Sequence, residues 1–360
     1  MGHLHACHVH PKPSEGRRAG DCFVRRVVRS SFDMLRTGGF MQRSPRWLLA
    51  IFLALAASHS ALADDTLKLA IGQRGNWENS PPELGQKAGF FKKRGLTLEL
   101  LYTQGAGETL QAVISGSVDL GIGVGTAGVM GAFAKGAPVR AIANSTTGAD
   151  DLFWYVPATS PIKSIKDTGG KTIAYSTNGS STNLAVLAFN REFGVQAKPV
   201  ATGSPSATFT QTMSGQVDIG WSAPPFGIEA LQQGRIRIVV RESDVPAFRN
   251  QTVRLMIANT ATAEQRRDAI DRFLQAYRET LDWMYADPAA LKAYAEWVGI
   301  SEGLAKEVRD KFYPKENLRL DRLSGLDEAM ADAVSLKFLS APLTRQQQDE
   351  LFKHYARSTK

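Results

Sequence analysis

The chain has 360 residues, a formal net charge of +8 and 2 cysteines. Its first 63 residues hold 9 of the 43 basic residues, 3 of the 35 acidic residues and both cysteines, so the remainder has a net charge of +2 and one histidine, His354. That remainder offers no basis for disulfides, cysteine or histidine nucleophiles or a histidine-built metal site, and we predict neither catalytic residues nor a cofactor. A charge so close to zero also gives no support to nucleic-acid binding.

Residues 41–63 are predicted to be a cleavable secretory signal peptide. Two arginines precede an apolar run over 47–57, and Ala61 and Ala63 supply the small residues of a cleavage site. The apolar run is too short to span a membrane. Residues 1–40, upstream of it, are interpreted as the result of a start codon assigned too early, or as a disordered leader. We therefore expect a periplasmic protein.

Two stretches of the chain repeat each other at an offset of 99 residues. "MSGQVDIGWSAPP" (213–225) restates "ISGSVDLGIGVGT" (114–126), with Asp119 and Asp218 at equivalent positions beside a Ser-Gly pair. A repeat of this length implies two similar α/β units. Because both copies keep the aspartate beside the Ser-Gly pair, we predict that it fixes the turn and does not bind a ligand.

Strands and helices alternate within each unit, which indicates sheets with helices on both faces. The segments expected in the first unit are a strand at 67–72, a helix at 81–94, a second strand, a helix ending at Ser115-Gly116, the Val-Asp strand, a helix at 127–136 and a strand at 137–143. Their counterparts in the second unit include a strand at 171–176, a helix at 181–193, a helix at 225–234 and a strand at 235–240. A strand at 252–259 and helices at 263–286, 288–299, 302–312, 323–339 and 345–356 complete the chain.

The expected fold class is α/β, with two similar lobes of mostly parallel sheet and a helical C-terminal extension that packs on lobe one. Lobe one is predicted over 64–148, lobe two over 149–250, and the return strand with the C-terminal helices over 251–360. The chain then crosses between the lobes twice, near 145–152 and near 243–255.

Gly123, Gly125 and Gly128 form a G-x-G-x-x-G pattern, which raises the question of a dinucleotide-binding loop. That fingerprint belongs after the first strand of a unit, whereas these glycines follow the third, and no acidic residue ends the next strand. The second copy of the repeat reads "WSAPPF" at this place. What both copies share is a helix N-terminus at the carboxyl end of a sheet, where ligands bind in open α/β folds.

Several ordered motifs resemble the periplasmic substrate-binding proteins of ABC importers for nitrate, sulfonates and taurine. They are "LKLAIGQRG", "AGFFKKRGLTLELL", "LQAVISGSVDLGIG", "GAPVRAIA", "SPIKSIKDTGGKTIAYSTNGSSTNLAVLA", "MSGQVDIGW" and "EALQQGRIRIV". The resemblance covers 65–260 and implies the class II binding-protein fold. It also implies a small-molecule ligand held between two lobes, closure on binding, delivery to a permease in the inner membrane, and a monomer.

Applied to this sequence, the resemblance places ligand contacts on loops at strand ends. The candidates are Gln73, Asn76, Trp77, Gln104, Gly105, Thr126, Asn144, Ser176, Asn178, Ser180, Ser181, Thr182, Trp221 and Ser222. An indole such as that of Trp77 can cover a planar ligand, although it can equally be a hydrophobic plug under its loop. The hydroxyl run at 180–182 caps a helix and can also bind.

One departure from the family bears on the ligand. An aromatic-acid-proline element is common after the second Val-Asp strand, whereas Trp221 is followed here by Ser222 and Ala223. An amine would want a carboxylate partner, so taurine-like recognition is in doubt. With Arg74 and Arg241 as the main cationic candidates, we expect a small organic anion such as a sulfonate or an aromatic carboxylate.

Other functions remain open at this point. A ligand-sensing receptor module would use the same closure, and a protein that binds thiamine-pyrimidine precursors would use the same fold. Some relatives of this fold synthesise that pyrimidine with cysteine- and histidine-bearing sites, which the processed chain lacks. We therefore expect a binding protein and not an enzyme.

Overall fold

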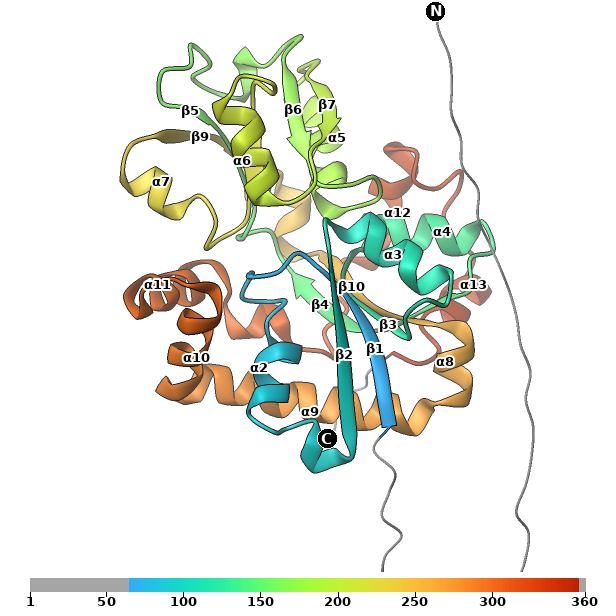
Figure 1. The fold of residues 1–360 in the computed structure, drawn as a ribbon. Helices are drawn as coiled ribbons and strands as arrows, with labels where there is room; N and C mark the ends of the chain where they lie inside the picture. The colour runs from blue at the N-terminus through green and yellow to red at the C-terminus, as the bar shows by residue number, and fades with distance from the viewer. Residues whose placement is uncertain (1–64, 356–360) are drawn as a thin grey trace, which may run out of the picture. The chain divides into compact units, whose positions relative to one another are not determined.

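The computed structural model describes residues 65–355, so the predicted leader and signal peptide lie outside the described residues. One sheet has five strands in the order β2-β1-β3-β10-β4 (Figure 1). These are β1 (Asp65–Gly72), β2 (Leu96–Thr103), β3 (Leu120–Gly125), β4 (Val139–Thr147) and β10 (Thr252–Asn259). We call this sheet and its helices lobe one. β10 is buried along nearly its whole length, in keeping with its apolar run over 255–258.

The helices that connect the strands of lobe one are short. They are α2 (Pro81–Lys87), α3 (Ala106–Ile114) and α4 (Thr126–Ala134). The helix expected over 81–94 ends at Lys87, because Gly89 adopts a left-handed conformation (φ 83°) and turns the chain into a separate 3-10 segment, η1 (Lys92–Arg94). A glycine inside an apolar helical pattern is therefore a stop signal here.

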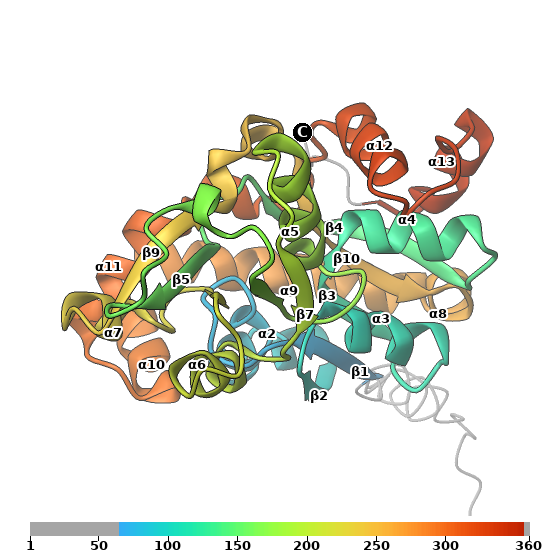
Figure 2. The same ribbon diagram turned by 90° about the horizontal axis from the view of Figure 1, so that it is seen from above.

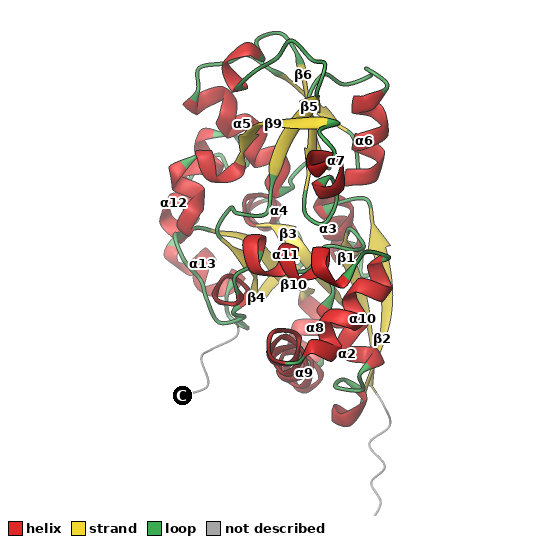
Figure 3. Ribbon diagram, turned by 90° about the vertical axis from the view of Figure 1, so that its left-hand side faces the viewer, coloured by secondary structure: helices red, strands yellow, loops and turns green. Residues whose placement is uncertain are grey.

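Lobe two contains a three-stranded sheet, β8-β5-β9, and a two-stranded pair, β6-β7. Its elements are β5 (Phe153–Pro157), η2 (Ile165–Asp167), β6 (Thr172–Tyr175), α5 (Ser181–Glu192), β7 (Lys198–Ala201), α6 (Pro205–Met213), β8 (Gly220–Ser222), α7 (Ile228–Gln232) and β9 (Ile236–Arg241). A single parallel bridge between Ile173 and Ile219 joins the two groups of strands. Helices α5 and α6 lie on opposite sides of these strands (Figure 3).

The sheets are mixed, because one strand in each lobe runs against the others, so the expectation of mostly parallel sheets is met only in part. β1, β2 and β3 are parallel, and so are β6 and β7. The strands that follow each crossing between lobes run the other way: β5 is antiparallel to β8 and β9, and β10 is antiparallel to β3 and β4. The crossings themselves fall between β4 and β5 and between β9 and β10, the latter containing η3 (Glu242–Asp244) and η4 (Pro246–Asn250).

The internal repeat has a structural counterpart. Helices α3 and α6 both have nine residues and begin 99 positions apart. Asp119 Oδ2 accepts a hydrogen bond from the backbone N–H of Lys68 in β1 at 2.9 Å, and Asp218 Oδ2 accepts one from Thr172 in β6 at 2.8 Å. Each aspartate thus ties its turn to the first strand of its own unit, as the repeat predicts.

The C-terminal part is helical as expected, and most of it covers lobe one. It comprises α8 (Thr260–Gln265), α9 (Arg267–Ala286), α10 (Pro288–Val298), α11 (Glu302–Phe312), η5 (Lys315–Leu318), α12 (Leu326–Ser335) and α13 (Arg345–Leu351). The long helix α9 packs on α2 and β2, and α12 and α13 pack on α4 (Figures 1 and 2). The extension also touches lobe two, because Asp332 pairs with Arg191 at 2.8 Å and Tyr313 Oη donates to the Pro224 carbonyl at 2.8 Å.

Candidate functional site

A small cavity lies where the loops of the two lobes meet. Its volume is about 20 Å³, room for roughly one water molecule. Lobe one lines it with Gly72, Gln73, Glu78, Asn79, Ala106, Gly123 and Arg254, the first crossing with Leu152, and lobe two with Ser176, Ser180, Ser181, Thr182 and Trp221. Gly72 ends β1 and Ser176 follows β6, so the cavity lies at the carboxyl ends of parallel strands, where ligands bind in open α/β folds.

Direct hydrogen bonds join the lobes around this cavity. The backbone N–H of Gly107 in α3 donates to Thr177 Oγ1 at 2.8 Å, and Arg254 Nε donates to Ser181 Oγ at 3.0 Å. Because Ser181 is the first residue of α5, the guanidinium of lobe one meets the N-terminus of a lobe-two helix. The structure is therefore one in which the lobes are in contact.

The G-x-G-x-x-G glycines serve this contact. Gly123 has a left-handed φ of 76°, and a Cβ there would lie 2.9 Å from Asn79 Oδ1. A Cβ on Gly125 would lie 2.6 Å from the Gly179 carbonyl oxygen, and one on Gly128 would collide with the same atom. The space above the motif is thus filled by the backbone of a lobe-two loop, which needs residues without side chains beneath it.

Arg254 is the centre of a buried charge cluster. Its guanidinium makes a two-pronged contact with Asp151, at 2.8 and 3.0 Å, and lies 3.5 Å from Glu78 and 3.9 Å from Glu242. All four side chains are at most 6% exposed. Asp151 belongs to the first crossing and Glu242 to the second, so one arginine connects both crossings, lobe one and Ser181 of lobe two.

Burial changes the protonation of this cluster. Desolvation raises the pKa of Glu78 to about 7, with Asp151 adding to the rise and Arg254 opposing it. Desolvation raises the pKa of Glu242 to about 8, again against Arg254. Desolvation works against the charge of Arg254, but Asp151 and Glu78 more than offset it and raise its pKa, so the guanidinium stays charged. Near neutral pH the cluster therefore carries less negative charge than three ionised carboxylates would give it.

The lobe-two side of the cavity is a network of hydroxyl groups at the start of α5. Thr182 Oγ1 lies 2.9 Å from Ser176 Oγ and 2.8 Å from Ser180 Oγ, and it accepts the backbone N–H of Ser176 at 2.9 Å. Ser180 is the N-cap of α5, and its Oγ accepts the Asn183 N–H at 3.1 Å. Helix capping and a row of hydroxyls at the cavity thus coexist.

Three side chains of the cavity keep a buried polar atom that has no hydrogen-bond partner among the described residues. They are Glu78, through Oε2, Asn79, through Oδ1, and Trp221, through Nε1. Each of the three residues is at most 3% exposed. Buried polar groups are nearly always paired in folded proteins, so these atoms mark a place where a bound molecule would complete the pairing.

Six of the residues predicted to bind ligand line the cavity. They are Gln73, Ser176, Ser180, Ser181, Thr182 and Trp221. No bound ligand tests their role, which stays a prediction. Their position agrees with the reasoning that placed them at strand ends.

The other eight predicted residues do not line it. Trp77 is fully buried, packs edge-on against Tyr294 with ring centroids 4.7 Å apart, and donates from Nε1 to Tyr285 Oη at 3.0 Å. The structure therefore gives it the alternative role of hydrophobic plug. Asn144 and Thr126 bond to the Arg319 and Thr252 carbonyls at 2.9 and 2.6 Å. The remaining residues also lie outside the lining, namely Asn76, Gln104, Gly105, Asn178 and Ser222.

Sequence reasoning missed Glu78, Asn79 and Arg254. It took Arg74 and Arg241 as the main cationic candidates, but neither lines the cavity. Arg74 stacks on the Trp297 ring at 4.6 Å instead. The signal that could have found Arg254 is its place as the one charged residue in the strand "TVRLMIAN", since a charge in a buried strand needs partners.

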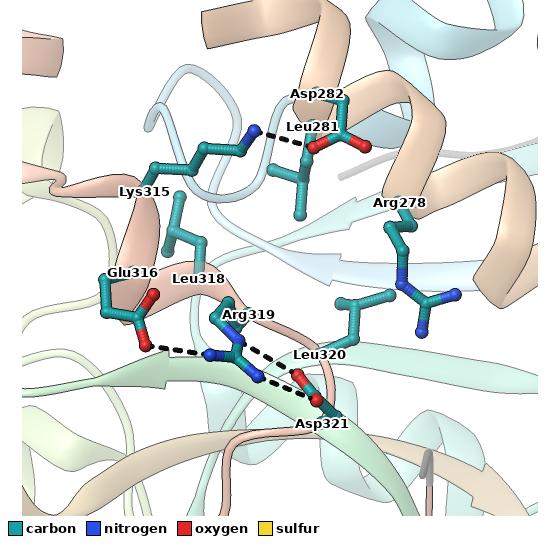
Figure 4. Close-up of a pocket in the computed structure, with 9 residues that line it drawn as sticks. All are labelled: Arg278, Leu281, Asp282, Lys315, Glu316, Leu318, Arg319, Leu320 and Asp321. Carbon is teal, nitrogen blue, oxygen red and sulfur yellow. Dashed lines mark hydrogen bonds and ion pairs between the residues drawn. The ribbon is translucent and has the colours of Figure 1, made fainter. Parts of the chain in front are cut away.

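A second hollow, of about 430 Å³, lies between α9 and the η5 segment (Figure 4). Its charged groups other than Arg278 pair with one another: Lys315 pairs with Asp282 at 2.6 Å, and Arg319 pairs with Glu316 at 3.2 Å and with Asp321 at 2.9 Å. Pairs of this kind at an exposed rim leave no buried polar atom for a ligand to complete. The interlobe cavity is therefore the better candidate site.

Within residues 65–355, no group of three or more His, Cys, Asp and Glu side chains is arranged to hold a metal ion. No helix in this part of the chain is both long and apolar enough to cross a bilayer.

Comparison with known proteins identifies the fold. The model of the NMT1/THI5-like family matches residues 80–291. A 4-amino-5-hydroxymethyl-2-methylpyrimidine phosphate synthase of Saccharomyces cerevisiae, THI12, is 22% identical over 262 residues, covering 67% of this chain and 74% of the yeast protein.

Two solved sulfonate-binding proteins are similar in structure. The alkanesulfonate-binding protein SsuA of Xanthomonas axonopodis pv. citri, solved with MOPS bound, has a TM-score of 0.65 at 18% identity and covers 81% of this chain and 98% of its own. The aliphatic sulphonate-binding protein SsuA of Escherichia coli has a TM-score of 0.61 at 20% identity, with coverages of 78% and 91%. At these identities the likeness confirms the predicted periplasmic binding-protein fold.

Proposed function

The chain belongs to the NMT1/THI5-like family, and we propose that within it this protein is a periplasmic solute-binding protein. It captures a small organic anion between its lobes and delivers it to an ABC permease in the inner membrane. The solute-binding fold of the sulfonate-binding neighbours supports this reading.

The observation that carries the proposal is the meeting of Arg254 with the N-terminus of α5. The Arg254 Nε lies 3.0 Å from Ser181 Oγ, so the cation of one lobe and the first residue of a 12-residue helix of the other lobe face the same point. Both favour an anionic group, the arginine through charge-assisted hydrogen bonds and the helix through its free N–H groups. A sulfonate or carboxylate that entered between them would replace the Arg254–Ser181 bond and connect the two lobes.

A synthase is the second candidate, because the yeast relative is named as one. We favour a binding protein, since the chain beyond residue 63 has no cysteine and a single histidine, His354, far along the chain from the residues that line the cavity. The pyrimidine in that relative's name nevertheless belongs among the ligands to be tested.

The test is a thermal-shift screen of the purified protein, followed by titration calorimetry of the hits. The compounds are alkyl and aryl sulfonates, taurine, aromatic carboxylates, nitrate and 4-amino-5-hydroxymethyl-2-methylpyrimidine. A ligand that binds the folded state raises its stability by about 2.7 kcal/mol at one hundred times its dissociation constant. Anions that bind wild type and fail to bind Arg254→Met support the proposal, provided that the variant is folded by circular dichroism. A protein that binds none of the anions contradicts it.

Localisation has its own measurement. Cell fractionation followed by N-terminal sequencing should find the protein in the periplasm, beginning at Asp64. A protein that stays in the cytoplasm with residues 1–63 attached would contradict the proposed compartment.

A further inference from the structure

The unpartnered atoms of the cavity divide by lobe and by polarity. With Glu78 ionised, its Oε2 and Asn79 Oδ1 are acceptors on lobe one, and Trp221 Nε1 is a donor on lobe two. The donors next to Glu78 bond to its other carboxylate oxygen: Asn76 Nδ2 and Arg254 Nη1 lie 3.3 and 3.5 Å from Oε1, so Oε2 has no partner among the described residues.

Asn79 shows the same pattern. Its Nδ2 is committed to the Gly72 carbonyl, while its Oδ1 lies over Gly123, where a Cβ would come within 2.9 Å of it. A glycine at 123 therefore keeps room beside an acceptor that nothing in the described chain uses. A molecule that satisfies lobe one must bring hydrogen-bond donors, and one that satisfies Trp221 must bring an acceptor.

We propose that the solute carries a positively charged N–H group beside its anionic head, and that Glu78 and Asn79 select for this group. The inference rests on the proposed function and deepens it: the anionic head lies toward Arg254, Trp221 and α5, and the ammonium or amidinium group lies toward Glu78 and Asn79. Related proteins often carry an acidic residue just after the second Val-Asp strand, and this chain does not. Glu78 of lobe one supplies the carboxylate for the cationic group instead.

The charge balance around Arg254 favours such a solute over a simple anion. The guanidinium is already occupied by the two oxygens of Asp151, and Glu78 and Glu242 lie within 4 Å of it. A bare anion would add negative charge to a cluster that has three carboxyl groups and one guanidinium. A solute of zero net charge adds none, and its cationic group stabilises the ionised form of Glu78.

The experiment uses matched pairs of probes that differ by the amine. The pairs are 2-aminoethanesulfonate with ethanesulfonate, 3-aminopropanoate with propanoate, and 4-(aminomethyl)benzoate with 4-methylbenzoate, each titrated by calorimetry into the purified protein. We expect the amine-bearing member of at least one pair to bind roughly 10- to 100-fold more tightly, as a charge-assisted hydrogen bond to a buried carboxylate would give.

Glu78→Gln should reduce this preference about tenfold or more, because it replaces the carboxylate by a neutral amide of the same shape. Glu83→Gln is the matched control. Glu83 is a partly buried carboxylate of lobe one that pairs with Lys87 at 2.8 Å and does not line the cavity.

Each outcome separates this inference from the proposed function. If the amine-free members bind as well as their partners, the inference fails while anion capture stands. If no member of any pair binds while another anion of the screen does, the inference fails and anion capture stands; if no anion of the screen binds, both fail. If the preference exists but Glu78→Gln retains it, the assignment to Glu78 is wrong. The wild-type preference is measured without any variant, so a misfolded Glu78→Gln protein would still leave the inference open to refutation.

Discussion

Gly125→Ala should hold the lobes apart without damaging either of them. The new Cβ would lie 2.6 Å from the Gly179 carbonyl oxygen and 2.8 Å from the Ser181 nitrogen, whereas ordinary contact begins at 3.4 Å, so the loop must retreat by about 0.8 Å. Both obstacles are backbone atoms and no rotamer change relieves them. Overpacking of this kind costs roughly 1–3 kcal/mol, which corresponds to a loss of roughly 5- to 150-fold in solute affinity.

Lobe one itself tolerates the methyl group, because the φ of −57° and ψ of 125° at Gly125 are open to alanine. Gly169→Ala is the control, since a Cβ there meets nothing within 4 Å. The chain beyond residue 63 has no cysteine, so spin labels can be placed on K135C in lobe one and K198C in lobe two, both exposed positions. Pulsed EPR should give longer interlobe distances for Gly125→Ala than for Gly169→Ala. Identical distances and affinities in the two variants would refute the reasoning.

Trp77→Phe should lower the free energy of unfolding by about 1–2 kcal/mol and leave solute affinity unchanged, because the indole packs and bonds inside lobe one. Trp221→Phe should lower the free energy of unfolding by a similar amount, because its indole is 1% exposed, and should in addition weaken binding roughly tenfold, because its Nε1 bonds to nothing in the described chain. Urea unfolding and calorimetry on both variants measure these effects, and an affinity that falls for Trp77→Phe but not for Trp221→Phe would contradict the assignment of the site. Arg254→Met should cost about 3–5 kcal/mol in urea unfolding, because it leaves buried carboxylates without their cation; a loss below about 1 kcal/mol would mean that they are paired elsewhere. Burial raises the pKa of Glu78 to about 7 and that of Glu242 to about 8, from an ordinary 4.5. Between about pH 5 and 8 the folded protein therefore binds more protons than the unfolded chain does. Its free energy of unfolding should therefore fall as pH rises from about 5 to 8, and Glu242→Gln should make that fall shallower; a wild-type profile that is flat over this range would contradict the burial of these groups.

Local signals in the sequence predicted helices and strands well where a cap or a stop was visible. The helix expected at 181–193 is α5, Ser181–Glu192, and Ser180 caps it as its position suggested. The helix expected at 81–94 was too long because Gly89 ends it early. Strand direction was not predictable in the same way, since apolar alternation is the same for a parallel and an antiparallel strand.

The site was predictable only in part. Ser180 and Ser181 could be placed because they follow a strand whose end is visible in the sequence, and Trp221 because it lies in the short strand β8 directly after the repeated Val-Asp motif. The charge of Arg254 in an apolar strand marks it as unusual, but its partners could not be named, because Glu78 and Asp151 lie 176 and 103 residues away along the chain. Spacing along a sequence carries no information about contacts that only the packing of two lobes creates.

The small size of the cavity has a consequence for kinetics. A space of about 20 Å³ admits no organic solute, so a molecule can enter only after the lobes separate and can leave only when they separate again. The observed rate of association should therefore stop rising at high solute concentration, at a plateau set by the frequency of opening. Residence time would then be governed by the contacts of Gly107, Gly125 and Gly128 with the opposite lobe as much as by any group that touches the solute.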